Sequence, residues 1–300
     1  MTPDLALGTY HCRDIPRAAA HAVVRGASWI DTAPNYRAGQ AHTLLAASVL
    51  PQQRQVRIST KTGFFAREEA EAAVSAGILT REQAKAGHSL TANFLRWQTT
   101  RTLNVLGRAD VVFVHNPEHV RLDREELHER LRDAFAVLEE YADAGHVGGY
   151  GVATWSGLDS GAFTVPELLT LAREAAGTDE HHLHAVQLPV SLVMARPISL
   201  ALDGRGPLVQ ARAAGLDTFV SSPLHGGELP GMVTPELAEL IDPGLTPAQA
   251  ALGIVASTPG VTRILLGTNN PAHWDAAART IALPPLPLAT LRKVLDVLGT

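Results

Sequence analysis

The sequence predicts an α/β fold, a single (β/α)8 barrel of the TIM-barrel type, on three observations. The chain has 300 residues. Eight short apolar or β-branched runs, each bounded by turn residues, recur along it, and the segments between them carry helical periodicity. Strands separated by helices must pair in parallel, and eight such units suit a closed barrel better than an open sheet, which uses fewer strands. No linker divides the chain, so we expect one domain over residues 1–300.

The eight predicted strands follow one another along the whole chain. Each is a run of six or seven residues, which is a usual length for a strand. They are LALGTY from Leu5, SWIDTA from Ser28, VRISTK from Val56, DVVFVH from Asp110, VGGYGVA from Val147, HAVQLPV from His184, DTFVSS from Asp217 and RILLGT from Arg263.

The clearest predicted helix follows the fourth strand. Asp123, with Glu126 three residues later, resembles a capping box, and Gly145 is a suitable C-terminal stop. Apolar side chains between them recur every three or four residues and therefore share one face. They are Leu127, Leu131, Phe135, Leu138 and Tyr141.

Two predicted connections are longer than a barrel requires. One spans residues 64–90, after the third strand, and the other spans residues 225–247, after the seventh. Both follow the C-terminal ends of strands, which is the face where barrels of this type carry their sites.

Composition and charge exclude several classes of protein. The chain has 25 Lys and Arg against 30 Asp and Glu, so its net charge is 25 − 30 = −5, which argues against a nucleic-acid binder. The single cysteine, Cys12, excludes an internal disulfide or a Cys-pair zinc site. No apolar run reaches the roughly 20 residues of a membrane span, and the first residues lack a secretory pattern. We therefore expect a cytoplasmic protein with neither a nucleic-acid nor a membrane partner. The sequence does not indicate its oligomeric state.

Four residues that can transfer protons follow consecutive predicted strands. Asp31 ends the second strand and Tyr36 follows it, while Lys61 and His115 end the third and fourth. A tyrosine, with a pKa near 10, is a poor acid or base at neutral pH. A neighbouring lysine favours the phenolate and lowers that pKa, and an aspartate can hold the lysine. Taken singly, each residue has a plainer explanation, as a surface charge or a structural histidine.

Three segments around these residues resemble the aldo-keto reductase family. GASWIDTAPNY runs from Gly26 to Tyr36, STK ends at Lys61, and TRTLNVLGRADVVFVHNPE contains His115. The resemblance spans nearly the whole chain. It implies that Asp31, Tyr36, Lys61 and His115 form the catalytic tetrad of the family.

The resemblance also implies a nicotinamide dinucleotide on the barrel mouth, with NADP(H) expected and NAD(H) as the alternative. AVQLPV carries a glutamine that contacts the nicotinamide amide, SSPLHGG resembles the pyrophosphate loop, and LLGTNNPAHWDAA resembles the segment that holds the adenosine end. The implied cofactor-binding residues are Gly8, Thr9, Asp31, Thr154, Gln187, Ser221, Ser222, Pro223, Leu224, Gly226, Gly267, Thr268, Asn269, Asn270 and His273.

The cofactor segments depart from the family pattern. Ala153 and Thr154 stand where the family usually has Ser-Asn, and Ser221 stands where an aromatic ring often stacks on the nicotinamide. After the eighth strand, Asn269 and Asn270 occur where a basic residue usually pairs with the 2′-phosphate of NADP. His42 replaces a glutamate common after the tyrosine. Cofactor preference is therefore open.

Other features carry less weight. His181, His182 and His184 lie just before the sixth strand, at the opposite end from the tetrad, and no carboxylate or cysteine completes a ligand set. We therefore expect a solvated loop and no metal site. Cys12 has no organised base and is expected to be inert. Five aromatic or imidazole side chains could line a substrate pocket or merely pack: Tyr10, His11, Phe64, Phe65 and Trp155.

The expected function is hydride transfer between the cofactor and a small carbonyl or alcohol substrate, with Tyr36 as general acid or base. The HNPE context and the long third connection are similar to sugar-oxidising aldose dehydrogenases, the first alternative. A nucleotide-sensing regulatory subunit and a barrel with non-redox proton transfer are further alternatives. Assays in both directions and cofactor-binding measurements distinguish these functions.

Overall fold

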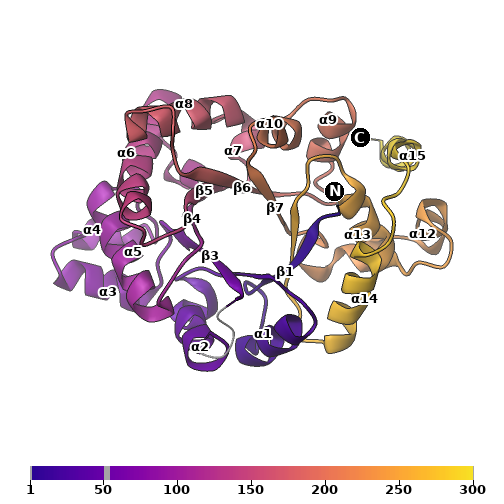
Figure 1. Cartoon of the computed structure of the whole chain (residues 1–300), viewed down its shortest axis with the longest axis horizontal. Coiled ribbons are helices and arrows are strands. Elements are labelled where there is room, and N and C mark those ends of the chain that lie inside the picture. The colour runs from indigo at the N-terminus through magenta and orange to yellow at the C-terminus, as the bar shows by residue number, and fades with distance from the viewer. Residues whose placement is uncertain (1, 51–54, 300) are drawn as a thin grey trace.

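The computed structural model describes residues 2–50 and 55–299, and its centre is a closed barrel of eight strands (Figure 1). The strands occur in sequence order around the barrel. They are β1 Asp4–Gly8, β2 Trp29–Asp31, β3 Arg57–Thr62, β4 Val111–His115, β5 Tyr150–Ala153, β6 Leu183–Pro189, β7 Asp217–Ser221 and β8 Arg263–Leu266. All neighbouring pairs are parallel, and β8 closes the barrel on β1 with Leu7 opposite Leu266. The predicted fold is confirmed.

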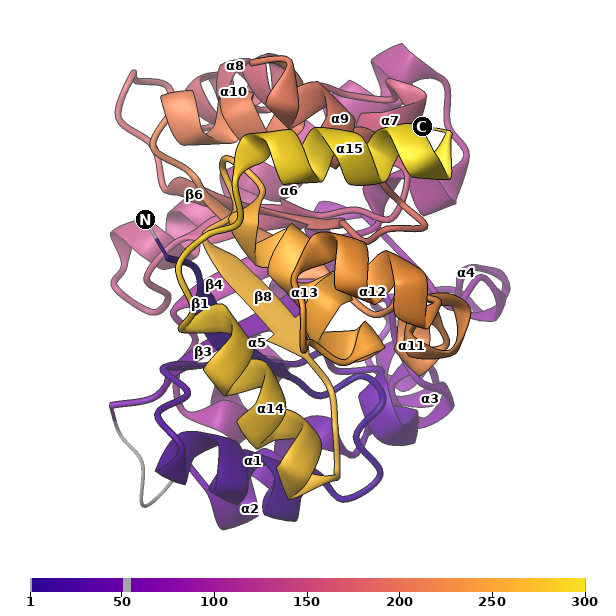
Figure 2. The same cartoon turned by 90° about the vertical axis from the view of Figure 1, so that its right-hand side faces the viewer.

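Helices surround the strands on the outside of the barrel (Figures 1 and 2). Those that connect consecutive strands are α1 Ile15–Val24, α2 Ala41–Ser48, α5 Ala92–Leu106, α6 Arg124–Asp143, α8 Val165–Ala176, α9 Arg196–Leu202, α10 Pro207–Ala213 and α13 Pro247–Ser257. After β8 come α14 Pro271–Ile281 and α15 Leu288–Leu298. None of the helices within the described ranges is both long and apolar enough to cross a bilayer.

The predicted helix after the fourth strand is α6, and it has the expected N-cap and C-terminal glycine. The Asp123 side chain accepts a hydrogen bond from the Glu126 backbone N–H, and Gly145 follows the helix with a φ of +70°. Leu127, Leu131 and Phe135 are buried, as is Leu138, whereas Tyr141 is only partly buried. The 3.6-residue period therefore identified the face that packs on the barrel.

The two long connections fold into additional helices at the C-terminal end of the barrel. The first contains α3 Arg67–Ser75 and α4 Arg81–Lys85, and the second contains η3 His225–Gly227, α11 Leu229–Met232 and α12 Pro235–Ile241. Buried Gln98 of α5 anchors the first: its side-chain oxygen accepts from the Thr62 hydroxyl and the Gly63 N–H, and its nitrogen donates to the Phe64 carbonyl. This anchor fixes the connection next to the end of β3.

The structure has two apolar cores, one inside the barrel and one between the barrel and its helices. The inner core consists of Ala6, Trp29, Val111, Phe113, Ala153, Ala185, Phe219 and Leu265. Gly151 of β5 leaves room for the Phe113 ring, since a Cβ at this position would lie 2.6 Å from that ring and 2.4 Å from the Ala185 carbonyl oxygen. The small residue is therefore required by the packing inside the barrel.

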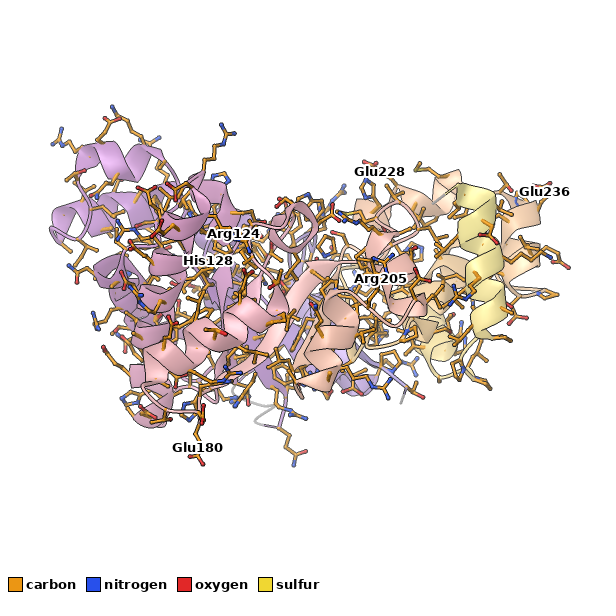
Figure 3. All side chains as sticks on the ribbon, turned by 90° about the horizontal axis from the view of Figure 1, so that it is seen from above. Arg124, His128, Glu180, Arg205, Glu228 and Glu236 are labelled. Atoms are coloured by element: carbon orange, nitrogen blue, oxygen red, sulfur yellow. The ribbon has the colours of Figure 1, made fainter. Side chains whose placement is uncertain are left out.

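The two ends of the barrel are marked by labelled side chains in Figure 3. Glu228, on the loop after β7, and Glu180, on the loop before β6, lie at opposite edges of the molecule. The end that carries Glu228 is the mouth, where the C-terminal ends of all eight parallel strands meet.

Replacing Gly151 with Ala should lower the free energy of unfolding by about 1–3 kcal/mol, because overpacking a rigid core forces its neighbours to move. Urea unfolding measures this change. Gly231→Ala is the matched control, since no atom lies within 4 Å of a Cβ there and Ala favours a helix. Equal stability of the two variants would contradict the proposed packing inside the barrel.

Candidate active site

Four polar side chains converge on the mouth from three neighbouring strands. Asp31 is the last residue of β2, Lys61 lies near the end of β3, and His115 is the last residue of β4. Tyr36 begins η1 Tyr36–Gly39, directly after β2. Because β2, β3 and β4 are consecutive in the barrel, the residues that the sequence analysis grouped lie together.

Lys61 and Asp31 form a buried ion pair. The Lys61 Nζ lies 2.5 Å from the Asp31 Oδ2, and their side chains are only 1% and 5% exposed. Lys61 also donates to the Thr32 carbonyl at 3.1 Å. The second carboxylate oxygen, Oδ1, accepts from the Ser59 hydroxyl at 2.9 Å and from the Gln187 amide at 3.1 Å. Residues of β2, β3 and β6 therefore form the hydrogen bonds of this ion pair.

Tyr36 lies against the ion pair and is enclosed by aromatic rings. The Lys61 Nζ is 5.2 Å from the centroid of the Tyr36 ring. The ring centroids of Tyr10 and His115 lie 5.0 and 6.2 Å from that of Tyr36, which is 9% exposed. The phenol is therefore held in a largely dry environment beside a cation.

The predicted lowering of the Tyr36 pKa is wrong for this structure. Burial raises the pKa of Tyr36 well above its ordinary value, and the negative charge of Asp31 raises it further. The main reason is burial, which disfavours the charged phenolate. Burial also lowers the pKa of Lys61, although Asp31 opposes this effect. The structure favours a protonated Tyr36.

His115 is enclosed by other rings and stays neutral. Burial, followed by the charge of Lys61, holds the pKa of His115 well below its usual range. The Phe64 ring lies 4.9 Å from it, and the His88 Nε2 donates to the His115 carbonyl at 2.8 Å. His88, which the sequence analysis missed, is brought here by an antiparallel bridge between Phe64 and His88. Nothing in its local sequence indicates this position.

Glu118 joins the loops after β4 and β5. Its Oε1 accepts from the Thr154 hydroxyl at 2.8 Å and from the backbone N–H groups of Trp155 and Ser156 at 2.9 Å each. The Thr154 hydroxyl in turn accepts from the Gly157 N–H. The Thr154 hydroxyl therefore already donates its hydrogen to Glu118. The sequence analysis quoted the HNPE segment without assigning Glu118 a role.

The residues predicted to bind a cofactor lie on loops that leave neighbouring strands. Gln187 is in β6, and the segments after β7, β8 and β1 follow around the mouth, since β7 pairs with β8 and β8 with β1. Ser221, Ser222 and Leu224 are partly exposed, while Pro223 is buried; Gly226 and His273 are exposed. The structure thus brings these segments to one side of the barrel mouth.

Several of these residues are already used in internal contacts. The buried Thr9 hydroxyl donates to the Asp31 carbonyl. Gly8 and Gly267 let β1 and the loop after β8 approach, because a Cβ on Gly267 would lie 2.8 Å from the Gly8 carbonyl oxygen. The Thr268 hydroxyl accepts from the Asn270 N–H. For these residues, packing or a hydrogen bond already explains the residue type.

The two asparagines after β8 hold the backbone together. The Asn269 side chain accepts from the Arg13 N–H at 2.6 Å and donates to the Asp14 carbonyl at 3.0 Å. The Asn270 side chain caps α14 by accepting from the Ala272 N–H. Both amide groups of Asn269 are thus used within the protein, and neither asparagine carries a positive charge.

The loop after β7 has features that suit an anionic ligand. Ser222 and His225 have φ values of +50° and +48°, and the His225 Nδ1 is buried without a hydrogen-bond partner among the residues that the structure describes. A Cβ on Gly226 would lie 3.9 Å from the His11 Nε2, so this loop faces the loop after β1. An imidazole nitrogen without a partner can donate to a phosphate oxygen. The residues present therefore fit a dinucleotide at the mouth.

The remaining candidates have different environments. Phe65 packs on Phe94 and is 7% exposed, so it is a core residue, whereas Tyr10 and Trp155 are 63% and 47% exposed. Burial raises the pKa of the Cys12 thiol to about 11, as expected for an inert cysteine. Buried His42 hydrogen-bonds Thr60, and burial lowers its pKa to about 3.

A groove of about 490 Å³ lies outside the mouth, between α3 and α4. Phe65, Arg67, Glu71 and Arg81 are among its lining residues, and none of the four predicted catalytic residues lines it. The groove therefore has no part in the chemistry proposed below.

The expectation that no carboxylate accompanies the histidines before β6 is wrong. Glu139 and Asp143 of α6 lie beside His182, whose Nδ1 is 2.6 Å from the Glu139 Oε2. The sequence could not indicate this group because about forty residues separate its members.

Comparisons with known proteins agree with this geometry. The family model described as the aldo/keto reductase family matches residues 8–295. Among solved structures, an aldose reductase from Giardia lamblia is 16% identical with a TM-score of 0.66, over 99% of this chain and 92% of that one. A glycerol dehydrogenase from Gluconobacter oxydans is 17% identical with a TM-score of 0.72, over 98% and 91%. No curated protein matches the chain.

A third solved structure is an aldo-keto reductase from Klebsiella pneumoniae in complex with NADPH. It is 16% identical with a TM-score of 0.65, over 99% of this chain and 91% of that one. At such low identities, the solved structures show only that the fold is shared. The family model, which matches nearly the whole chain, shows the family. This chain therefore belongs to the aldo/keto reductase family and is an NAD(P)-dependent oxidoreductase.

Proposed function

We propose that this enzyme reduces the carbonyl group of a small aldehyde or ketone, with Tyr36 as the proton donor and NADP(H) as the preferred cofactor. The observation that carries the proposal is the buried Lys61–Asp31 pair beside the Tyr36 ring. A lone tyrosine or lysine at a strand end has plainer explanations, whereas this enclosed arrangement is typical of general acid–base chemistry.

The protonation states in the structure suit reduction. Because its pKa is raised, Tyr36 holds its proton at neutral pH and can deliver it to the carbonyl oxygen. Lys61 then stabilises the phenolate that remains, and Asp31 holds Lys61 in place. The reverse reaction, alcohol oxidation, would need the phenolate and is therefore favoured by alkaline pH.

His115 would orient the substrate as a neutral hydrogen-bond donor. Its Nδ1 is buried without a partner among the described residues, so we assign the ring proton to Nε2. A neutral imidazole has one N–H donor, and this one can hold the carbonyl oxygen for Tyr36. The Phe64 ring packs against the His115 ring, while His88 holds the His115 backbone through its carbonyl.

The cofactor would lie across the mouth, from β6 to the loops after β7 and β8. When bound, its nicotinamide supplies the hydride. Gln187 would orient the nicotinamide amide, and the loop containing Ser222 and His225 would bind the pyrophosphate. NADPH occurs in the Klebsiella pneumoniae relative, which supports NADP(H) here.

Replacing Tyr36 with Phe should lower turnover about 10²–10⁴-fold with little change in cofactor affinity, because only the transferable proton is removed. Steady-state kinetics with a model aldehyde and a cofactor titration measure the two quantities. Tyr141→Phe is the matched control, since its hydroxyl donates to the Arg96 carbonyl far from the mouth. Wild-type turnover in a folded Tyr36→Phe enzyme, when chemistry limits the rate, would exclude the proposed role.

Reductive turnover of the wild-type enzyme should vary little between about pH 6 and pH 9, because a tyrosine whose pKa lies above about 10 stays protonated there. It should fall only as pH rises through the pKa of Tyr36. Lys61→Met removes the cation that favours the phenolate, so the pH profile of alcohol oxidation should move upward. Lys61→Arg retains the cation and serves as control. An unchanged pH profile in a folded Lys61→Met enzyme would contradict the proposed effect of the Lys61 charge on the Tyr36 phenolate.

NADPH should be preferred over NADH by less than about 100-fold in kcat/KM, or about 2.7 kcal/mol. The reason is that Asn269 and Asn270 are neutral and already hydrogen-bonded within the protein. Kinetics with the two cofactors at one ionic strength measure this ratio. A larger preference would show that a cation from another segment reaches the 2′-phosphate.

A further inference from the structure

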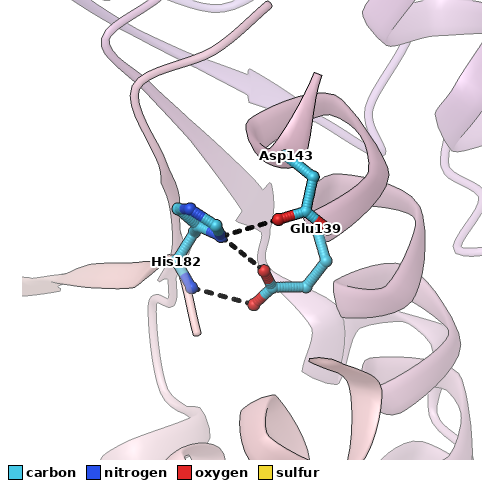
Figure 4. Close-up of side chains that lie close together, drawn as sticks. All are labelled: Glu139, Asp143 and His182. Carbon is cyan, nitrogen blue, oxygen red and sulfur yellow. Dashed lines mark hydrogen bonds and ion pairs between the residues drawn. The ribbon is translucent and has the colours of Figure 1, made fainter. Parts of the chain in front are cut away.

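Three potential metal ligands meet at the end of the barrel opposite the tetrad. Glu139 and Asp143 lie one turn apart on α6, and His182 precedes β6 (Figure 4). The imidazole points between the two carboxylates. This group connects a helix of the outer layer to a strand of the barrel.

The three ligand atoms lie close enough together to share one small metal ion. The His182 Nδ1 lies 2.6 Å from the Glu139 Oε2 and 3.8 Å from the Asp143 Oδ1, and all three ligand atoms lie within 4.8 Å of one another. A tetrahedral metal with bonds of about 2.1 Å separates its ligands by about 3.4 Å. The 2.6 Å contact is a hydrogen bond, which a metal would replace after the imidazole and the Glu139 carboxylate move apart by about 0.8 Å.

Glu139 is oriented by contacts on its other oxygen. Its Oε1 accepts from the Tyr150 hydroxyl at 2.7 Å and from the His182 backbone N–H at 2.9 Å, and the residue is only 4% exposed. These contacts leave Oε2 facing the imidazole. Hydrogen bonds that fix a ligand in this way are typical of metal sites.

The group also lacks a permanent positive charge. Among the described residues, the ion pairs of Glu139 and Asp143 involve only His182, which is charged only when protonated. A buried carboxylate without a fixed cation is costly. A divalent ion would balance both carboxylates and would leave the imidazole neutral.

We propose that Glu139, Asp143 and His182 bind a divalent transition metal, with zinc as the ion that the donor set suits best. One imidazole nitrogen and two carboxylate oxygens are common zinc ligands, whereas magnesium and calcium prefer oxygen alone. Water can complete the coordination, because the side chains of His182 and Asp143 are 36% and 73% exposed. The metal would stabilise the contact between α6 and β6, away from the chemistry at the mouth.

The test uses the full-length protein after treatment with a chelator. Isothermal titration calorimetry with zinc chloride should show that the wild-type protein binds one equivalent of zinc. The Asp143→Asn and His182→Asn variants should not bind this equivalent. At a zinc concentration about 100 times Kd, Tm should rise by about 4 °C, whereas magnesium chloride should leave it unchanged. Cobalt should give the visible absorption of a tetrahedral site, a readout that does not depend on stability.

The matched control is Asp133→Asn, which makes the same change on the same helix. Asp133 lies on the surface and is 4.0 Å from Arg130, so this variant should keep the zinc equivalent and the shift in Tm. Asp143 is mostly exposed, and its replacement should leave the fold intact. The chain has 13 histidines, and zinc binding that survives both Asp143→Asn and His182→Asn would belong to other residues and overturn the proposal. Absence of the equivalent from the wild-type protein would also overturn it.

Discussion

The arrangement of the mouth depends on one buried ion pair, between Lys61 and Asp31. Removing two charges from water is costly, and such a pair persists only where further hydrogen bonds satisfy it. Here Ser59, Gln187 and the Thr32 carbonyl provide those bonds. Gln187 lies 156 residues from Asp31 in the chain, so only closure of the barrel completes the pair. The fold and the site thus form together.

Burial around this pair sets the protonation of its neighbours. Burial dominates at Tyr36, the charge of Asp31 acts in the same direction, and the phenol stays protonated. Burial acts in the opposite direction on a histidine, since its charged form is the protonated one, and it keeps His115 neutral. The same dry environment therefore leaves both rings as uncharged hydrogen-bond donors beside a single ion pair.

The sequence was sufficient for the barrel and for grouping the tetrad, because periodicity and chain order alone place strand ends at one mouth. The role of Ser59 could also be predicted, since it precedes Lys61 by two residues and so shares its face of β3. The roles of His88 and Glu139 could not be predicted from the sequence. His88 reaches His115 through an inserted connection, and Glu139 meets His182 only after α6 packs on the barrel at β5. Likewise, the pKa of Tyr36 depended on burial, which sequence spacing does not reveal.

The two ends of the barrel use left-handed backbone differently. At the end opposite the mouth, Gly145 and Gly177 follow α6 and α8 with φ near +70°, and glycine adopts this conformation without steric cost. At the mouth, Asn116, Ser222 and His225 adopt φ values of +44° to +50°, which side chains other than glycine rarely do. Such strain persists only where the surrounding structure enforces it. Ser222 and His225 therefore keep a conformation that glycine would adopt without strain, and Gly226 and Gly227 share it in the same loop.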